Sequence, residues 1–226
     1  MGAIINTKNL SRDFITGAEV VHAVKDVSID VIEGQLTILR GRSGSGKTTL
    51  INLLGAMDMP SNGEIYFNDK DITKMSQKQR DELRRKNIGF VFQSGALISS
   101  LTAYENIEFG LRIAGYARKE RGKRTDECLE MVGLSKRKMH YPHELSGGEC
   151  QRVAIARAIA HMPQVIFADE PTAALDTNMA LQVVKVFKDL VERQGLTIVM
   201  TTHDPSMMEV ADIVYTLQDG EVVNEQ

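Results

Sequence analysis

The sequence predicts an α/β fold: a mostly parallel sheet covered by helices on both faces, with a β-rich edge and an inserted helical lobe. From Glu149 onward, helical segments alternate with short buried apolar runs, as crossover helices and parallel strands do. From Ile4 to Phe67 the apolar runs are short and β-branched, whereas from Ser76 to about Met139 the charge density rises and the periodicity becomes helical. We expect one domain over residues 1–226, with a helical subdomain inserted at about 94–150.

Strands and turns dominate the first part of the chain. The predicted strands are Val27–Ile32, Leu36–Arg40 and Glu64–Phe67, and the predicted turns are Glu33-Gly34 and Ser61–Gly63. The second of these strands leads directly into a glycine-rich loop. A helix is predicted over Thr49–Gly55, with three leucines, Leu50, Leu53 and Leu54, on one face.

The remaining elements follow from the same periodicities. Two charged helices are predicted in the lobe, Gln77–Lys86 and Arg118–Met131, the second with Cys128, Leu129, Met131 and Val132 toward the interior. The C-terminal part is predicted to contain the helices Cys150–Ala160, Leu181–Arg193 and Pro205–Val210, the strands Val165–Ala168 and Thr197–Thr201, and a hairpin of Val214–Leu217 with Glu221–Val223 around Asp219-Gly220.

Composition excludes several classes of protein. With 27 basic and 30 acidic residues the formal charge is −3, which argues against a dedicated nucleic-acid binder. Two cysteines, Cys128 and Cys150, suit a reducing compartment rather than a disulfide framework. The first residues carry no basic segment followed by an apolar one, and no apolar run has the length of a membrane span. We therefore expect a cytoplasmic protein without a nucleic-acid partner.

Residues Gly41–Thr48 form a loop with the pattern G-x-x-x-x-G-K-[ST]. Glycines let backbone N–H groups surround an anion, and the helix that follows presents its positive N-terminus. Lys47 is expected to reach the β- and γ-phosphates of a nucleotide, and the Thr48 hydroxyl is expected to bind Mg²⁺. The predicted ATP-binding residues of this segment are Gly41, Arg42, Ser43, Gly44, Ser45, Gly46, Lys47, Thr48 and Thr49.

Two adjacent carboxylates, Asp169 and Glu170, end the apolar run that begins at Val165. In an extended chain successive side chains point to opposite sides, so the two groups can have different roles. Asp169 is expected to hold Mg²⁺, and Glu170 is expected to act as the general base toward the attacking water. These residues together indicate an ATP or GTP hydrolase.

A second glycine motif, Leu145–Glu149, opens a helix and offers further free N–H groups and the Ser146 hydroxyl. Alone it is also compatible with a simple helix cap. With this motif in place, the whole chain closely resembles the ATP-binding subunits of ABC transporters, because their motifs occur here in family order. Gly41–Thr48 resembles Walker A, Gln93 the Q-loop, Leu145–Glu149 the signature motif, Val165–Asp169 Walker B, Ala174–Asp176 the D-loop and His203 the switch histidine.

The resemblance implies a P-loop NTPase fold with a RecA-like parallel core, an N-terminal antiparallel β subdomain and an inserted α-helical subdomain. It also implies roles for individual residues. Phe14 would stack on adenine, Gln93 would touch Mg²⁺ or the attacking water, His203 would contact the γ-phosphate, Ser146, Gly147 and Gly148 would bind the nucleotide of the other subunit, and Asp176 would link the two sites. Glu149 stands where the family most often has Gln, and Cys150 is expected to be a packing residue.

Within the family the sequence is similar to the macrolide-export, lipoprotein-release and bacitracin-resistance ATPases, on segments that include Asn87–Gln93 and Leu101–Ile107. This implies a homodimer with ATP at its interface and a membrane permease as partner, with the chain peripheral on the cytoplasmic face of the membrane. Ser94–Tyr104 is the expected docking segment. Two alternatives stay open: an ABC-type ATPase that acts on nucleic acid or ribosomes, and a divisome-type ATPase that regulates a membrane protein without transport. A nucleotide kinase is disfavoured, since it would share only the phosphate loop.

Overall fold

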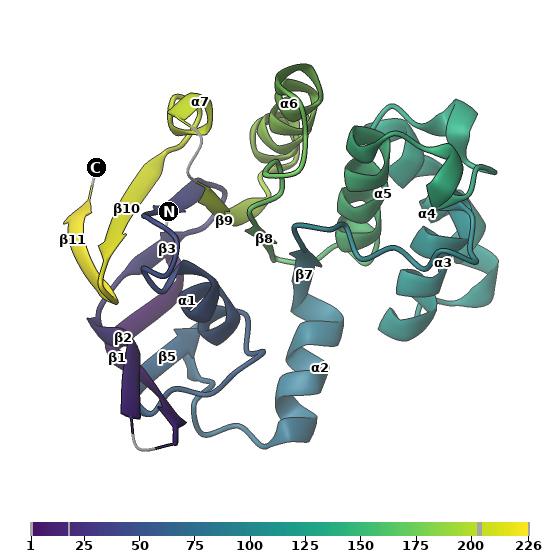
Figure 1. Ribbon diagram of the computed structural model, residues 1–226. Coiled ribbons are helices and arrows are strands. Elements are labelled where there is room, and N and C mark those ends of the chain that lie inside the picture. Colours follow the sequence, from purple (N-terminus) through teal and green to yellow (C-terminus); the bar gives the residue numbers. More distant parts are fainter. Residues whose placement is uncertain (1, 18, 203–204, 226) are drawn as a thin grey trace.

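The computed structural model describes residues 2–17, 19–202 and 205–225, and its strands form two sheets (Figure 1). The six-stranded sheet has the order β11-β10-β4-β9-β8-β7. Its strands are β4 (Leu36–Arg40), β7 (Ile88–Val91), β8 (Val165–Asp169), β9 (Thr197–Thr202), β10 (Ile213–Gln218) and β11 (Glu221–Glu225). Neighbouring strands are parallel except β10 and β11, which form an antiparallel hairpin. The predicted α/β fold with a parallel core is confirmed.

The smaller sheet is antiparallel and has the order β2-β1-β5-β6, with β3 also paired to β1. Its strands are β1 (Ala3–Thr16), β2 (Glu19–Val27), β3 (Asp30–Ile32), β5 (Asn62–Phe67) and β6 (Lys70–Asp71). The single strand predicted over Val27–Ile32 is wrong, because the structure divides it between β2 and β3. The predicted turn at 61–63 is also partly wrong, since Asn62 pairs with Ser11 and already belongs to β5.

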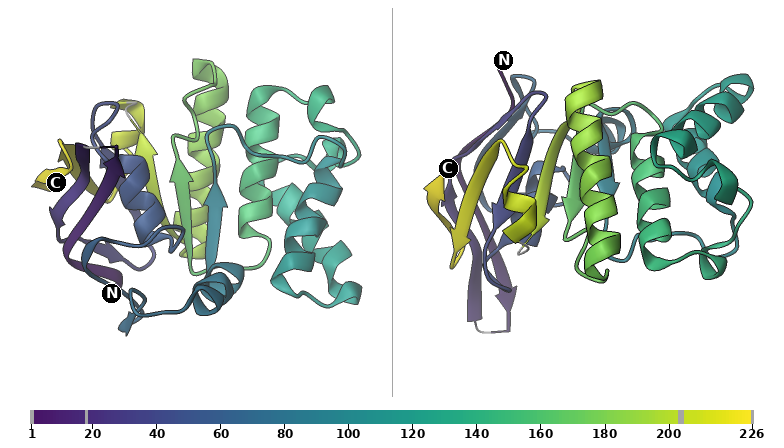
Figure 2. Two further views of the ribbon diagram at one scale, coloured as in Figure 1. Left: turned by 60° about the horizontal axis from the view of Figure 1, so that its bottom comes forward. Right: turned by 90° about the horizontal axis from the view of Figure 1, so that it is seen from above.

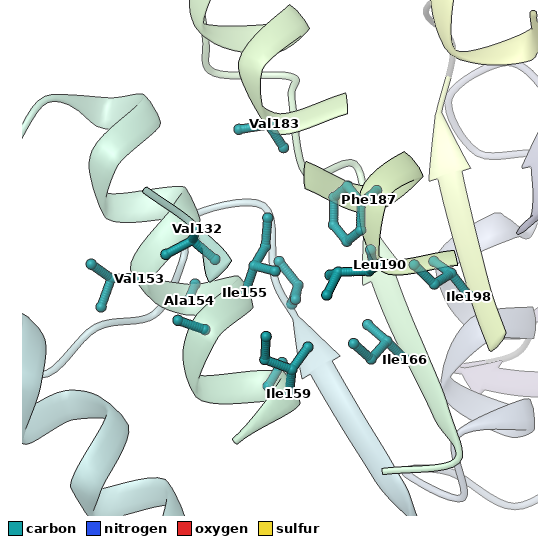
Figure 3. Packing of buried hydrophobic residues seen from close by; sticks show 14 of the residues in the cluster. Val132, Val153, Ala154, Ile155, Ile159, Ile166, Val183, Phe187, Leu190 and Ile198 are labelled. Carbon is teal, nitrogen blue, oxygen red and sulfur yellow. The ribbon is translucent and has the colours of Figure 1, made fainter. Parts of the chain in front are cut away.

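The parallel sheet is buried on both faces, as its near-continuous apolar strands require. On one face Phe167 and Val199 pack with Leu50 of helix α1 (Lys47–Leu54) and with the smaller sheet. On the other face, helix α6 (Thr177–Gln194) covers the sheet, and Figure 3 shows Phe187 beside Ile198. The period-two alternation of the strands therefore separates two cores.

The helical lobe lies at one end of the molecule, away from β1 and β2 (Figures 1 and 2). Its elements are α3 (Ala103–Ala114), α4 (Arg118–Met131), the 3-10 turns η1 (Ser135–Arg137) and η2 (Pro142–Glu144), and the adjoining α5 (Gly147–Ile159). The sequence analysis did not predict α3. Its local signal is a capping box, in which the Glu105 carboxylate accepts from the Thr102 N–H at 2.8 Å and the Glu105 N–H donates to the Thr102 hydroxyl at 3.2 Å.

Other differences concern helix boundaries and one side chain. Helices α5 and α6 begin earlier than predicted, because Ser146 and Asp176 cap them at their N-termini. Helix α2 (Gln77–Asn87) matches its predicted range closely, but its predicted place in the helical lobe is wrong, since it lies against β7 at the edge of the parallel sheet (Figure 1). Helix α7 (Pro205–Met208) is shorter than predicted. Met131 is 38% exposed, so its predicted interior position is wrong; it is the last residue of α4. Of the helices in the described ranges, none has the length and apolarity that crossing a membrane requires.

Candidate nucleotide-binding site

The phosphate loop lies where predicted, between the end of β4 and the start of α1. Gly46 precedes the helix with φ of 99°, a conformation that side chains other than glycine strongly disfavour. A Cβ atom on Gly46 would lie 2.2 Å from the carbonyl oxygen of Ala23 on β2, so only glycine fits here. The loop is therefore held against a strand of the other sheet.

Lys47 points its ammonium group back across this loop. The residue is 6% exposed, and its Nζ donates to the carbonyl oxygens of Gly41 and Arg42 at 2.8 and 3.0 Å. The same Nζ lies 3.8 Å from Glu170 Oε1. The fold therefore brings Lys47, the buried cation of the loop, next to Glu170, one of the two predicted carboxylates.

The other carboxylate, Asp169, faces the start of α1. Its Oδ1 accepts from the Thr48 hydroxyl at 3.2 Å and from the Thr201 hydroxyl at 2.6 Å. Thr201 lies directly beside Asp169 in the β8–β9 register. Thr201 could not be identified from the sequence, because only the strand order makes it a neighbour of the carboxylate.

Glu170 leaves the strand through a left-handed turn. Its φ is 43°, and its N–H donates to the hydroxyl and carbonyl oxygens of Thr201 at 2.9 and 3.2 Å. The predicted separation of the two carboxylates is observed, but its predicted cause is wrong: the chain is not extended at Glu170. The turn directs Glu170 toward Lys47 while Asp169 faces Thr48.

A cavity of about 450 Å³ opens over the loop, within the size range of small-molecule sites. One wall is formed by the loop with Thr49 and Glu170. A second wall belongs to β2 and consists of Val21, His22, Ala23 and Lys25, and Asp219 also lines the cavity. This second wall was not predicted, because nothing local in the sequence of β2 indicates its contact with the loop.

Phe14 lies near this cavity but does not line it. It is 38% exposed and pairs across the β1–β2 ribbon with Val21, which does line the cavity. The guanidinium of Arg12 lies 4.5 Å from the centre of the Phe14 ring. Cation–π contact therefore occupies a face of this ring.

The second glycine motif lies outside the cavity. Ser146 caps α5, and Gly148 is buried against Met179 of α6, where an added Cβ would come within 3.0 Å. Asp176 caps α6 by accepting from the Met179 N–H at 2.9 Å. The structure thus brings Ser146, Gly148 and Asp176 to one region, and leaves that region separate from the phosphate loop of the same chain.

Gln93 is exposed and also does not line the cavity. The loop that follows it is fastened to α5. Arg157 donates to the carbonyl oxygens of Ala96 and Gly95 at 2.7 and 2.8 Å, and Gln151 donates to that of Phe92 at 3.1 Å. His203, predicted to contact the γ-phosphate, lies outside the described residues.

Comparison with known proteins gives a consistent result. A family model described as "ABC transporter" matches residues 24–173. An uncharacterized ABC transporter ATP-binding protein of Methanocaldococcus jannaschii is 42% identical over 97% of this chain and 98% of its own length. The macrolide export ATP-binding/permease protein MacB of Marinobacter nauticus is 41% identical over 98% of this chain, which spans 34% of that protein.

Among solved structures, the fold is similar to the ATP-binding cassette MJ0796 in a dimeric post-hydrolysis state bound to ADP and Pi. The TM-score is 0.90 at 39% sequence identity, and the alignment covers 98% of this chain and 97% of that chain. A second dimeric structure of MJ0796, described as a bacterial ABC transporter cassette, aligns with the same TM-score, identity and coverage.

Proposed function

This chain belongs to the ABC transporter family, and on that basis we propose that it hydrolyses ATP as the ATP-binding subunit of a transporter, with Mg²⁺ as its metal and a membrane permease as its partner. The observation that carries the proposal is the meeting of the phosphate loop with two carboxylates. Lys47 lies 3.8 Å from Glu170, and Thr48 bonds Asp169 at 3.2 Å. A cation for the phosphates and two separately directed carboxylates are what phosphoryl transfer to water requires.

The chemistry divides among these residues. The loop N–H groups and Lys47 bind the phosphates, and Lys47 exchanges the carbonyl oxygens of Gly41 and Arg42 for phosphate oxygens. Glu170 accepts the proton of the attacking water. Its left-handed turn, fixed by two bonds from its N–H to Thr201, holds the carboxylate on the side of Lys47.

The residues present fit a magnesium ion. Mg²⁺ prefers hard oxygen ligands, and the Thr48 hydroxyl and the Asp169 carboxylate supply two of them beside the cavity. When bound, the ion neutralises charge on the phosphates and orients them. Thr201 donates to the same Asp169 oxygen at 2.6 Å and so keeps the carboxylate turned toward Thr48. We include Gln93 as a further group that reaches the ion or the water.

A second copy of the chain completes the site. Ser146, Gly147 and Gly148 do not line the cavity of their own chain, although the Ser146 hydroxyl and the N–H groups of Gly147 and Gly148 lie at a helix N-terminus suited to an anion. A head-to-tail homodimer with two-fold symmetry would bring this motif over the partner's nucleotide. Asp176, at the neighbouring helix cap, would link the two sites, and Phe14 would stack on adenine once Arg12 moves from its ring.

The work is done on a membrane partner, and we place the chain at the cytoplasmic face of the membrane through its permease. Similarity to the macrolide export protein MacB favours efflux as the outcome, and we keep lipid or lipoprotein extraction and mechanical coupling as further outcomes of the same proposal. We treat residues 94–150 as an inserted helical subdomain and Ser94–Tyr104 as its docking segment. Ile98 in this segment is 37% exposed, and Leu97 packs partly against the core.

Substitution of Glu170 by Gln tests the composite site. The amide keeps the shape of the side chain but cannot take the proton, so turnover should fall by about 100-fold or more while ATP binding persists. Light scattering in saturating Mg-ATP should then find a stable dimer. The matched control is Lys47→Ala, which should lose nucleotide affinity and stay monomeric. A Glu170→Gln chain that binds ATP yet remains monomeric would contradict the proposal.

The permease is tested by isolating this chain from detergent-solubilised membranes and identifying what accompanies it by mass spectrometry. A stoichiometric integral-membrane protein with a large extracytoplasmic part supports the transport or mechanical-coupling function. Recovery with ribosomes or DNA, and without a membrane protein, would overturn it.

A further inference from the structure

The helix that carries the second glycine motif has a carboxylate in its first turn. Glu149 and Ser146 form a capping box: the Glu149 Oε2 accepts from the Ser146 N–H at 2.8 Å, and the Ser146 hydroxyl accepts from the Glu149 N–H at 3.2 Å. The Glu149 side chain is only 18% exposed. Its position beside Ser146 is therefore fixed by the fold.

This carboxylate is ionised at neutral pH. The hydrogen bond from the Ser146 N–H, chiefly, lowers the pKa of Glu149, and the nearby guanidinium of Arg137 adds to the effect. A negative charge in the first turn stabilises the helix. It also repels a second anion that approaches the free N–H groups of this turn. The motif that is to bind a phosphate thus contains a group that repels one.

Arg137 supplies the compensating charge. It ends the turn η1, and its Nε donates to Glu149 Oε1 at 3.1 Å. Its Nη1 lies 3.3 Å from His140 Nε2, a second contact that orients the guanidinium. Arg152 is a further cation near Glu149, but its side chain is turned to α6, where it donates to Gln182 at 2.6 Å.

We propose that Arg137 is a positioning residue for the signature motif: it neutralises and holds Glu149, so that the Ser146 hydroxyl and the N–H groups of Gly147 and Gly148 can donate to the terminal phosphate of the ATP bound by the partner subunit. The inference rests on the proposed function, since it needs the two-chain site. Arg137, in the turn η1 of the helical lobe, would thus act in the ATP-driven cycle although it does not line the nucleotide cavity of its own chain. Loss of Arg137 would leave a fixed, uncompensated carboxylate beside the incoming phosphate.

The test compares dimer dissociation constants in Mg-ATP, measured by analytical ultracentrifugation, with all variants made in the Glu170→Gln chain. Removing an ion pair at the protein surface changes an equilibrium by about two- to fivefold. A two-fold dimer contains two such sites, so Arg137→Gln should weaken it by about tenfold. Lys136→Gln is the matched control, because Lys136 is the exposed neighbour of Arg137 and its loss removes the same charge. This control should dimerise like its parent.

A double substitution separates neutralisation from simple support of the turn. Gln at position 149 keeps the capping box and removes the charge, so Arg137→Gln with Glu149→Gln should restore the parent dissociation constant within about twofold, a smaller change than an exposed ion pair usually makes. Raising the salt concentration should also shrink the defect of Arg137→Gln, because ions screen the repulsion between the Glu149 carboxylate and the phosphate. Binding of a fluorescent ATP analogue to the monomer should be equal in all variants, since the phosphate loop is unchanged.

Either of two results would overturn the inference: Arg137→Gln dimerises as tightly as its parent, or the double variant stays as weak as Arg137→Gln. If the Glu170→Gln parent itself fails to dimerise, the proposed function falls and this inference falls with it. That outcome is recognised in the parent alone, before any substitution at Arg137 is compared.

Discussion

Replacing Arg157 by methionine should release the loop that follows Gln93. The guanidinium donates to the carbonyl oxygens of Ala96 and Gly95 at 2.7 and 2.8 Å, and both residues have positive φ, 46° and 68°. For Ala96 such a conformation costs about 1–2 kcal/mol and must be held by its surroundings. The two hydrogen bonds from Arg157 restrain both carbonyl groups.

The magnitude follows from these contacts. Hydrogen bonds to a charged group contribute about 1.5–3 kcal/mol each. Ala96 is exposed, so water can replace one of them, and burial already lowers the pKa of Arg157, which means that its removal recovers part of a desolvation cost. We expect a net loss of about 2 kcal/mol in the free energy of unfolding for Arg157→Met, and about 1 kcal/mol for Arg157→Lys, which can keep one of the two bonds.

Methionine preserves the packing of the long side chain. A Cβ on Gly110 of α3 would lie 3.1 Å from Arg157 Cγ, so the stem of Arg157 fills the space beside this glycine, and the methionine stem fills it equally. The change therefore isolates the guanidinium. Urea unfolding gives the stability, and hydrogen exchange of amides 94–98 reports the loop. Arg112→Gln, at an exposed position on α3, is the control and should stay within about 0.5 kcal/mol of the wild type.

The reasoning would be refuted if Arg157→Met unfolded within about 0.5 kcal/mol of the wild type, the range of ordinary surface substitutions, with unchanged exchange in the loop. Equal losses for the Met and Lys variants would also contradict it, because a bidentate contact predicts a graded series.

Three further predictions concern stability. Phe187→Ala should lower the free energy of unfolding in urea by about 3–5 kcal/mol, because the ring is fully buried. Leu181→Ala on the same helix is the control and should lower it by less than about 1 kcal/mol, because Leu181 is 51% exposed. Similar losses for the two variants would contradict the observed packing. Gly89→Ala should lower the free energy of unfolding by about 1–3 kcal/mol, and with it the melting temperature, because the new Cβ would lie 2.6 Å from the carbonyl oxygen of Ala158. An unchanged melting temperature would contradict this and would show that α5 can shift freely. Burial raises the pKa of the Cys128 thiol from its ordinary 9.0 to about 11. The stability that the folded protein gains by keeping this thiol neutral is therefore fully present below about pH 9. This stability is lost as pH rises toward about 11, since the unfolded thiol ionises first. In urea titrations over this pH window, the free energy of unfolding of the wild type should fall by up to about 3 kcal/mol more than that of Cys128→Ala. Parallel pH profiles of the two proteins would exclude the effect.

Local sequence predicted most of the parallel core. The apolar runs at Leu36–Arg40 and Val165–Ala168 are strands because fully buried β-branched segments of this length have few other stable arrangements. The phosphate loop was equally predictable, since Gly46 adopts a backbone conformation that only glycine takes readily. Helix α3 was missed, although the capping box of Thr102 and Glu105 was present in the sequence.

What the sequence by itself determined is therefore the chemistry of this protein: a glycine loop with Lys47 and Thr48, two carboxylates after a buried strand, and a second glycine motif on a helix. Tertiary structure alone decided which groups meet. Thr201 reaches Asp169 through strand register, β2 forms a cavity wall because Gly46 lets it approach, and Arg137 meets Glu149 across a turn. Residue type and periodicity act over a few positions along the chain, whereas these contacts join segments that only packing of the whole fold brings together.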